Sequence, residues 1–143
     1  MAPGRVDLSG LRLLVVEDNY LMAEVLADTL GDFGCEVVGP APDVATGRKL
    51  ARDSDLDGAL LDINLFGEFC FPIARVLSDR GIPYIFVTGY DSTSMIPPEF
   101  ARVPRLAKPV EARDLATAIA ECFLNAPRTA PRAKGPTGYV PVR

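Results

Sequence analysis

Residues 13–18 read Leu13-Leu14-Val15-Val16-Glu17-Asp18, four apolar side chains followed at once by two carboxylates. A short run that is apolar throughout is typical of a central strand in a parallel sheet covered on both faces. The arrangement returns three times: Asp62 follows the run 59–61, Thr88 follows 85–87, and Lys108 follows 106–107. In open parallel sheets, ligands bind at the carboxyl ends of the strands. The sequence therefore predicts that these polar side chains meet at one edge of a sheet.

Helical patterns alternate with these runs. Apolar residues recur at three-to-four spacing over residues 20–30, and Gly31 follows, which indicates a helix and its end. Comparable patterns follow the later strands, but the stretch 88–98 is rich in Ser, Thr, Gly and Pro. The fourth helix is therefore expected to be short or irregular. Five strands alternating with helices predict an α/β domain with a doubly wound, five-stranded parallel sheet.

The two ends of the chain lack such patterns. Residues 1–10 are expected to form a flexible leader, and residues 11–124 a single folded domain. Residues 125–143 hold four prolines and four basic but no acidic side chains, and disorder is the expected state. A solvated tail is the simpler interpretation of this segment. A peptide that docks on a partner around Tyr139-Val140 is the alternative.

Composition excludes several classes of function. The first 125 residues carry 11 basic and 19 acidic side chains, a net charge of −8, which argues against nucleic acid as a partner. No apolar stretch approaches the roughly 20 residues that span a membrane, and no secretory pattern opens the chain. The three cysteines have neither disulfide nor zinc spacing, and histidine is absent. A cytoplasmic location with reduced thiols is expected.

The predicted cluster has a specific chemistry. Two like charges about 4 Å apart repel by roughly 4 kcal/mol at an effective dielectric constant near 20, so Glu17, Asp18 and Asp62 need a proton or a cation among them. Few carboxylate ligands completed by water suit Mg²⁺. A carboxylate can attack phosphorus, and Asp62 is the candidate nucleophile. Lys108 offers a charge and Thr88 a hydroxyl for the phosphoryl oxygens.

Each of these residues has a simpler interpretation when it is taken alone. Glu17 and Asp18 fit the start of a helix, and Asp62 fits a turn or a cap. Thr88 fits a loop, and Lys108 fits a solvated surface charge. Their joint placement at four strand ends favours the functional interpretation.

The four motifs resemble, in order and spacing, those of bacterial response-regulator receiver domains. They are residues 15–19 (Val-Val-Glu-Asp-Asn), 60–64 (Leu-Leu-Asp-Ile-Asn), 87–89 (Val-Thr-Gly) and 107–109 (Ala-Lys-Pro), and the resemblance covers residues 11–124. It implies a flavodoxin-like fold with strand order 2-1-3-4-5. It also implies that Asp62 accepts a phosphoryl group from a sensor histidine kinase or a histidine phosphotransfer protein.

The resemblance also assigns roles to individual residues. Asp18 and Asp62 would bind Mg²⁺ directly, Glu17 would act through water, and the main-chain carbonyl of Asn64 would complete the protein ligands. Thr88 and Lys108 would bind the phosphoryl group. The bond between Lys108 and Pro109 would be a cis peptide that places the ammonium over the pocket.

One departure from the family concerns the switch residue. Most receivers carry Tyr or Phe three residues before the lysine, where this chain has Arg105. Residues 83–90 (Pro-Tyr-Ile-Phe-Val-Thr-Gly-Tyr) resemble instead the FAT GUY class of receivers, which is associated with histidine kinases of the HWE type. Tyr90 is then the candidate to share the switch role with Thr88 and Arg105. The alternative is that Tyr90 only packs the loop.

The leading functional hypothesis is a stand-alone receiver that signals by protein contact through its fourth helical segment, fifth strand and fifth helix. It would catalyse only its own phosphoryl transfer and dephosphorylation, as a monomer or as a dimer that forms on phosphorylation. A phosphatase resembling the haloacid dehalogenases is the enzymatic alternative, but its Asp-x-Asp pair would have Asn64 in the second place. A receiver that binds partners without phosphorylation, for which Arg105 offers slight support, is the third.

Overall fold

The computed structural model describes residues 7–89, 95–124 and 139–140. Its main element is a parallel sheet of the five strands β1 (Arg12–Val16), β2 (Glu36–Ala41), β3 (Gly58–Asp62), β6 (Tyr84–Thr88) and β7 (Arg105–Ala107). Their order is β2-β1-β3-β6-β7, which confirms the predicted order 2-1-3-4-5. The order steps outward in both directions from β1 and β3, so a crevice is expected at their carboxyl ends.

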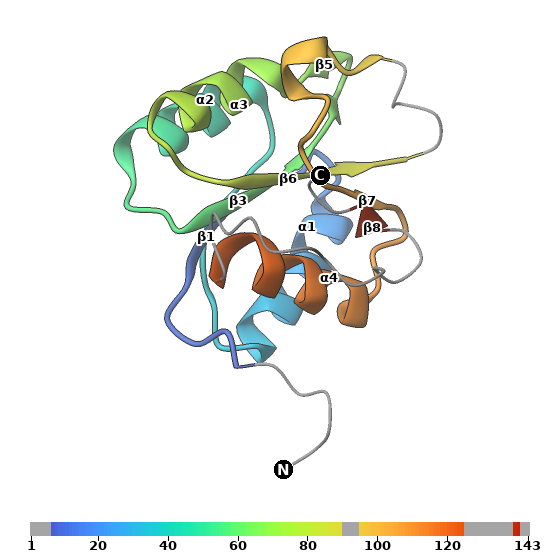
Figure 1. Cartoon of the computed structure of the whole chain (residues 1–143). Helices are drawn as coiled ribbons and strands as arrows, with labels where there is room; N and C mark the ends of the chain where they lie inside the picture. Colours follow the sequence, from blue (N-terminus) through green and yellow to red (C-terminus); the bar gives the residue numbers. More distant parts are fainter. Residues whose placement is uncertain (1–6, 90–94, 125–138, 141–143) are drawn as a thin grey trace.

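Helices cover both faces of this sheet (Figure 1). α2 (Val44–Asp53) and α3 (Phe71–Asp79) lie on one face. α1 (Tyr20–Asp32) lies on the other, beside α4 (Ala112–Ile119), which continues as the π-helix η3 (Ala120–Leu124). Alternate side chains of β1 enter opposite cores: Leu14 packs under α2 and α3, whereas Leu13 packs on the side of α1 and α4. The near-continuous apolar runs of the sequence follow from this burial on both faces.

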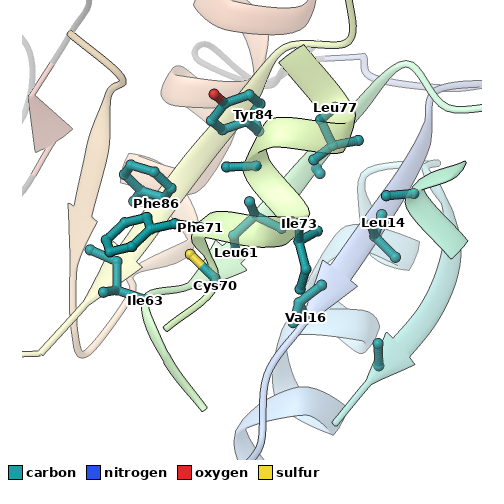
Figure 2. Packing of buried hydrophobic residues seen from close by; sticks show 14 of the residues in the cluster. Leu14, Val16, Leu61, Ile63, Cys70, Phe71, Ile73, Leu77, Tyr84 and Phe86 are labelled. Carbon is teal, nitrogen blue, oxygen red and sulfur yellow. The ribbon is translucent and has the colours of Figure 1, made fainter. Parts of the chain in front are cut away.

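An aromatic cluster fills the core on the side of α3 (Figure 2). The rings of Phe71 and Phe86 meet edge to face with centroids 5.8 Å apart. Phe100 stacks on Phe71 at 5.4 Å and also meets the ring of Tyr84 at 6.3 Å. Such contacts add roughly 0.5–1.5 kcal/mol per pair beyond the area that they bury. The cluster therefore anchors η2 (Pro98–Phe100), a short 3-10 helix before β7, to the centre of the domain.

Polar caps set where two helices begin. The side chain of Asn19 accepts a hydrogen bond from the N–H of Met22 at the start of α1. Asp43 accepts one from the N–H of Thr46 at the start of α2. Caps of this kind contribute about 1 kcal/mol each. The first cap also fixes the path of the chain directly after Glu17 and Asp18.

The predicted leader differs from the structure. Residues 1–10 were expected to be flexible, but Leu8 is fully buried in the core beneath α1 and α4. Its N–H donates to the carbonyl of Phe33, and the N–H of Gly10 donates to that of Gly34. One apolar side chain among polar neighbours gives no periodic signal, which is why sequence patterns miss it. Residues 1–6 lie outside the described residues.

The predicted tail also differs. No strand was expected after residue 124, but β8 (Tyr139–Val140) joins the sheet as a sixth strand, antiparallel to β7. The other residues of that segment lie outside the described part. Two residues are too few to show a strand period, so the pairing is a tertiary effect that composition could not reveal.

The sequence only partly predicted two of the connections between strands and helices, the one between β6 and β7 and the one after β3. Between β6 and β7, in the described residues 95–104, η2 is the helical element that the structure defines, which agrees with a short or irregular fourth helix. After β3, the loop forms a small hairpin of β4 (Asn64–Leu65) and β5 (Glu68–Phe69), which was not predicted. Among the described helices, none has the length and apolar character needed to cross a membrane.

Candidate functional site

Parallel pairing brings the predicted carboxylates together. Val16 at the end of β1 lies beside Leu61 in β3, so the next residues, Glu17 and Asp62, emerge side by side. Carboxylate oxygens of Glu17, Asp18 and Asp62 all lie within 4.8 Å of one another. The sequence predicted this cluster, and the carboxyl edge of the sheet contains it. Glu17 and Asp62 are buried, whereas Asp18 is partly exposed.

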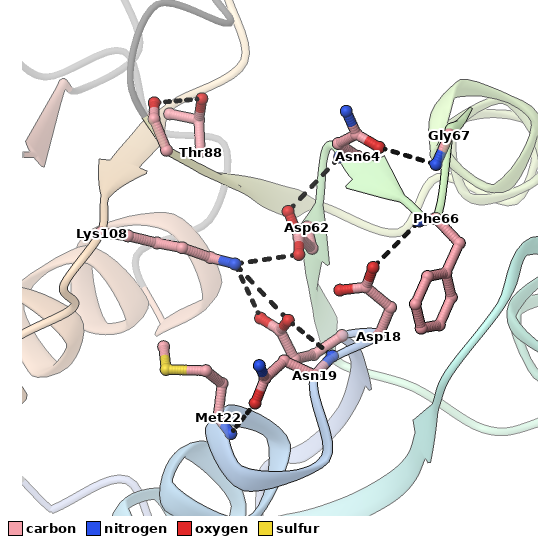
Figure 3. A network of polar contacts seen from close by, with 11 residues as sticks. Asp18, Asn19, Met22, Asp62, Asn64, Phe66, Gly67, Thr88 and Lys108 are labelled. Atoms are coloured by element: carbon pink, nitrogen blue, oxygen red, sulfur yellow. Dashed lines mark hydrogen bonds and ion pairs between the residues drawn. The ribbon is translucent and has the colours of Figure 1, made fainter.

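Lys108 extends from the end of β7 across the sheet edge to this cluster (Figure 3). Its Nζ atom lies 3.0 Å from Oδ2 of Asp62 and 3.2 Å from Oε1 of Glu17. The bond between Lys108 and Pro109 is a cis peptide. One cation therefore faces two buried carboxylates, and the third carboxylate, that of Asp18, is not paired with it.

Burial and, to a smaller extent, the neighbouring negative charge change the pKa of Glu17. Burial raises the pKa of Glu17 to about 7, with a smaller contribution from the charge of Asp62. The N–H of Asn19, which donates to Oε2 of Glu17 over 3.1 Å, and the ammonium of Lys108 oppose this rise. Burial disfavours the charged form of Lys108 as well, but its bonds and attraction to Asp62 and Glu17 outweigh burial and raise its pKa. The cluster therefore gains stability from an added positive charge.

Asp18 is held by the hairpin after β3. The N–H of Phe66 donates to Oδ2 of Asp18 over 2.9 Å, while the Phe66 ring is 79% exposed. Phe66 has a φ of 52° and Gly67 a φ of 87°, so the turn uses two left-handed residues in succession. The N–H of Gly67 donates to the side-chain oxygen of Asn64 over 3.1 Å. This turn aims a backbone donor at one Asp18 oxygen and leaves the other for a ligand.

Thr88 occupies the predicted strand end without joining the network. It is buried and follows Val87, which pairs with Asp62 across β3 and β6. Its hydroxyl donates to the carbonyl of Gly89 over 3.0 Å, away from the carboxylates (Figure 3). The hydroxyl would have to leave the Gly89 carbonyl to bind a ligand beside Asp62.

The remaining predicted residues lie at different distances from the cluster. Asn64 follows Asp62 closely, and its N–H makes a long contact of 3.4 Å with Oδ1 of Asp62. Arg105 is half-buried in β7 and pairs with Phe86 in β6. Tyr90, the other proposed switch residue, lies outside the described residues, so its role stays a prediction.

Two contributors were missed by the sequence analysis. Asn19 both caps α1 and gives its N–H to Glu17, and the position directly after the acidic pair was the signal that could have indicated it. Phe66 acts through its backbone, so its side chain carried no signal at all.

The donor set fits a small divalent cation. Three carboxylates offer hard oxygen ligands, which Mg²⁺ prefers. Among the described residues, Oε1 of Glu17 is buried and receives no hydrogen bond, although the Lys108 ammonium lies near it. A buried oxygen without a donor is an unusual cost that a bound ion or its water would remove. The arrangement can thus hold a cation beside Asp62 and an anionic group between the cation and Lys108.

Solved structures place the chain in a family. No protein-family model and no curated protein sequence matches it. A CheY-like response-regulator receiver domain from Methanospirillum hungatei has a TM-score of 0.71 and 26% identity, over 80% of this chain and 94% of that one. The present chain belongs to this family, the receiver domains of response regulators.

Two further solved structures are similar to this chain. SdrG from Sphingomonas melonis is 35% identical over 77% of this chain and 93% of that one, with a TM-score of 0.69. The receiver domain of a sensor histidine kinase from Pseudomonas aeruginosa shares the fold at 21% identity and a TM-score of 0.72, over 82% of this chain and all of that one. That structure contains a magnesium ion coordinated in its active-site cleft.

Proposed function

We propose that the chain is a phospho-acceptor of two-component signalling and that Asp62 is the residue that accepts the phosphoryl group. The contact that supports this most directly is the 3.0 Å ion pair between Asp62 and Lys108 within an acidic cluster. Asp62 ends β3 and is held from both sides by the neighbouring strand ends. Transfer of a phosphoryl group depends mainly on positioning and charge neutralisation, and this cluster supplies both.

In the proposed step a carboxylate oxygen of Asp62 attacks the phosphorus of a phosphohistidine on a partner. The new bond joins the Asp62 oxygen to phosphorus, the phosphorus–nitrogen bond breaks, and the imidazole takes the electron pair and a proton. Lys108 is placed to bind an oxygen of the transferred group, because its ammonium already contacts Oδ2 of Asp62. The Thr88 hydroxyl would bind another after it leaves the carbonyl of Gly89.

The cofactor of the proposed site is Mg²⁺. Asp18 and Asp62 would bind it directly, Glu17 through water, and Asn64 through its main-chain carbonyl. The ion would supply positive charge that screens the carboxylates and the phosphoryl oxygens. Phe66 keeps the Asp18 side chain turned toward the cluster by its N–H, and Asn19 does the same for Glu17.

The proposed donor of the phosphoryl group is a sensor histidine kinase of the HWE type or a histidine phosphotransfer protein. The support is the similarity of residues 83–90 to the FAT GUY receivers. Output would occur by contact with another protein, from a monomer or from a dimer that forms on phosphorylation. A faster transfer from an HWE-type kinase than from other histidine kinases would support this assignment, and equal rates would contradict it.

Phosphorylation by a small donor tests the acceptor itself. The full chain is incubated with Mg²⁺ and acetyl phosphate, and its intact mass is measured. We expect a gain of one phosphoryl group in the wild type and none in Asp62→Asn. Asp79→Asn, which changes an exposed carboxylate on α3, is the matched control and should gain the group like the wild type.

Two outcomes would contradict the proposal. Phosphorylation of Asp62→Asn at the wild-type rate would place the acceptor elsewhere. Equal phosphorylation of the wild type with Mg²⁺ and with an excess of chelator would remove the metal from the mechanism.

A further inference from the structure

β7 is one of the two edge strands of the five-stranded parallel sheet, and β2 is the other. The carbonyl of Pro104 accepts from the N–H of Phe86, and the N–H of Lys108 donates to the carbonyl of Thr88, so these two residues face β6. Backbone polar groups alternate in direction along a strand, so Arg105 and Ala107 direct their N–H and C=O groups away from β6. An open edge of this kind is a template on which another strand can pair.

β8 pairs with this edge. Arg105 lies opposite Val140, and Leu106 lies opposite Tyr139, in the antiparallel sense. Because the backbone N–H and C=O of Arg105 point away from β6, Arg105 and Val140 form a hydrogen-bonded pair. Leu106 and Tyr139 form the neighbouring pair, which has no hydrogen bonds between its two residues. The contact therefore provides hydrogen-bond partners for the backbone N–H and C=O of Arg105. Without β8, these two groups would be hydrogen-bonded to water.

We propose that the outer edge of β7 is a docking site for an extended peptide and that residues 139–140 of this chain are its resident occupant. Recognition through the backbone in this way is the general mode of strand addition to a sheet edge. A pairing of two residues is weak between separate molecules. Within one chain the effective concentration is on the order of millimolar, which makes the pairing more favourable than the same pairing between separate molecules at lower concentration.

The position of the site lets residues 139–140 control access of a partner strand to β7, without any change in the phosphorylation chemistry. The paired residue Arg105 is three positions before Lys108, and β7 forms the edge of the face that includes α4. A partner that adds a strand to β7 must displace residues 139–140. The pairing of β8 with β7 uses backbone groups alone, so it does not depend on whether Asp62 is phosphorylated.

Amide hydrogen exchange measured by NMR on the full chain tests the site. The double variant Tyr139→Pro/Val140→Pro removes both N–H groups of β8 and disfavours its pairing. We expect the Arg105 amide to exchange faster by roughly three- to tenfold, the range for loss of one backbone hydrogen bond. The Leu106 amide, which faces β6, should keep the wild-type rate. Tyr139→Ala/Val140→Ala retains both N–H groups and should leave the Arg105 rate near that of the wild type.

A second measurement does not depend on any variant. The Cα atoms of an antiparallel pair without hydrogen bonds are about 4.5 Å apart. The wild-type chain should therefore show a cross-peak between the Hα protons of Leu106 and Tyr139. Absence of this cross-peak, or an Arg105 amide rate that the double proline variant leaves unchanged, would overturn the proposal. An equal acceleration of Arg105 and Leu106 would also overturn it, because it would indicate general loosening of β7.

Discussion

The backbone N–H of Phe66 donates to Oδ2 of Asp18 across 48 positions of sequence, at 2.9 Å. A loop residue with an exposed ring thus positions a carboxylate of the site through its main chain. Phe66 has a left-handed conformation, with a φ of 52°, in the turn that presents this N–H to Asp18. The turn therefore has a conformational cost that its contact with the site offsets.

The first prediction concerns this left-handed residue. A side chain such as Phe at positive φ costs roughly 1–2 kcal/mol, and Asn tolerates this region better. We expect Phe66→Asn to raise the free energy of unfolding by up to about 1 kcal/mol in urea denaturation. Phe69→Asn is the control, because Phe69 stacks on Phe71 at 5.6 Å and its loss should lower stability. Equal destabilisation by both variants would contradict the prediction.

The second prediction concerns the binding of Mg²⁺. Asp18 contributes a charged ligand with one oxygen not used by the hairpin, so Asp18→Asn should weaken Mg²⁺ binding by roughly tenfold or more. Titration calorimetry or the shift of thermal unfolding with added Mg²⁺ measures this. Asp79→Asn, on the surface of α3, should bind the ion as the wild type does. Unchanged affinity in Asp18→Asn would exclude Asp18 as a ligand.

The third prediction concerns the only cation in the cluster among the described residues. Lys108→Gln leaves Glu17 and Asp62 buried without their ion-pair partner. With chelator at pH 8, we expect the free energy of unfolding to fall by about 2 kcal/mol, the scale of a lost charged hydrogen bond. Added Mg²⁺ should recover part of this loss. Lys49→Gln removes a distant, exposed pairing of 4.0 Å with Asp53 and should change stability by less than about 0.5 kcal/mol.

The fourth prediction concerns pH in the absence of metal. Burial raises the pKa of Glu17 from its ordinary value of 4.5 to about 7, so the folded state binds a proton that the unfolded state has lost between these values. The free energy of unfolding contributed by Glu17 is therefore full below about pH 4.5 and decreases as the pH rises to about 7. Comparison of urea denaturation curves with chelator at pH 5 and pH 8 should show a smaller decrease for Glu17→Gln. The same slope in variant and wild type would contradict the assignment.

The fifth prediction compares two glycines. A Cβ added at Gly58 in β3 would lie 2.6 Å from the ring of Phe123, whereas one added at Gly31 in α1 would meet nothing within 4 Å. We expect Gly58→Ala to lower the free energy of unfolding by about 1–3 kcal/mol through overpacking. Gly31→Ala should raise it by up to about 1 kcal/mol, because alanine favours the helix. Thermal unfolding of the two variants decides the sign of each effect.

The parts of the fold that the sequence predicted are those that depend on repeated burial. Runs such as 13–16 and 59–61 are apolar because both faces of each strand enter a core. The strand order then brings Glu17 beside Asp62, since adjacent parallel strands end together. Lys108 was predicted by the same logic, and a long flexible side chain can reach the cluster from β7.

The features that the sequence did not predict depend on single contacts or on backbone geometry. The hairpin donor at Phe66 and the pairing of Val140 with Arg105 both use main-chain groups that every residue possesses. The direction of the Thr88 hydroxyl is a rotamer choice, which residue type alone does not determine. Leu8 fills a gap beneath α1 and α4 without any periodic pattern.

The aromatic cluster has a mechanical consequence for any signal that begins at Thr88. Phe100 is 3% exposed and contacts the rings of Phe71, Tyr84 and Phe86, so the chain entering β7 starts from a fixed point. Arg75 adds a second restraint, because its guanidinium lies over the Phe100 ring at 5.6 Å and pairs with Glu99 at 2.7 Å. These contacts restrain the backbone route from Thr88 to β7 at Phe100. The direct route runs across the sheet, because the N–H of Lys108 donates to the carbonyl of Thr88 beside the pairing of β6 with β7.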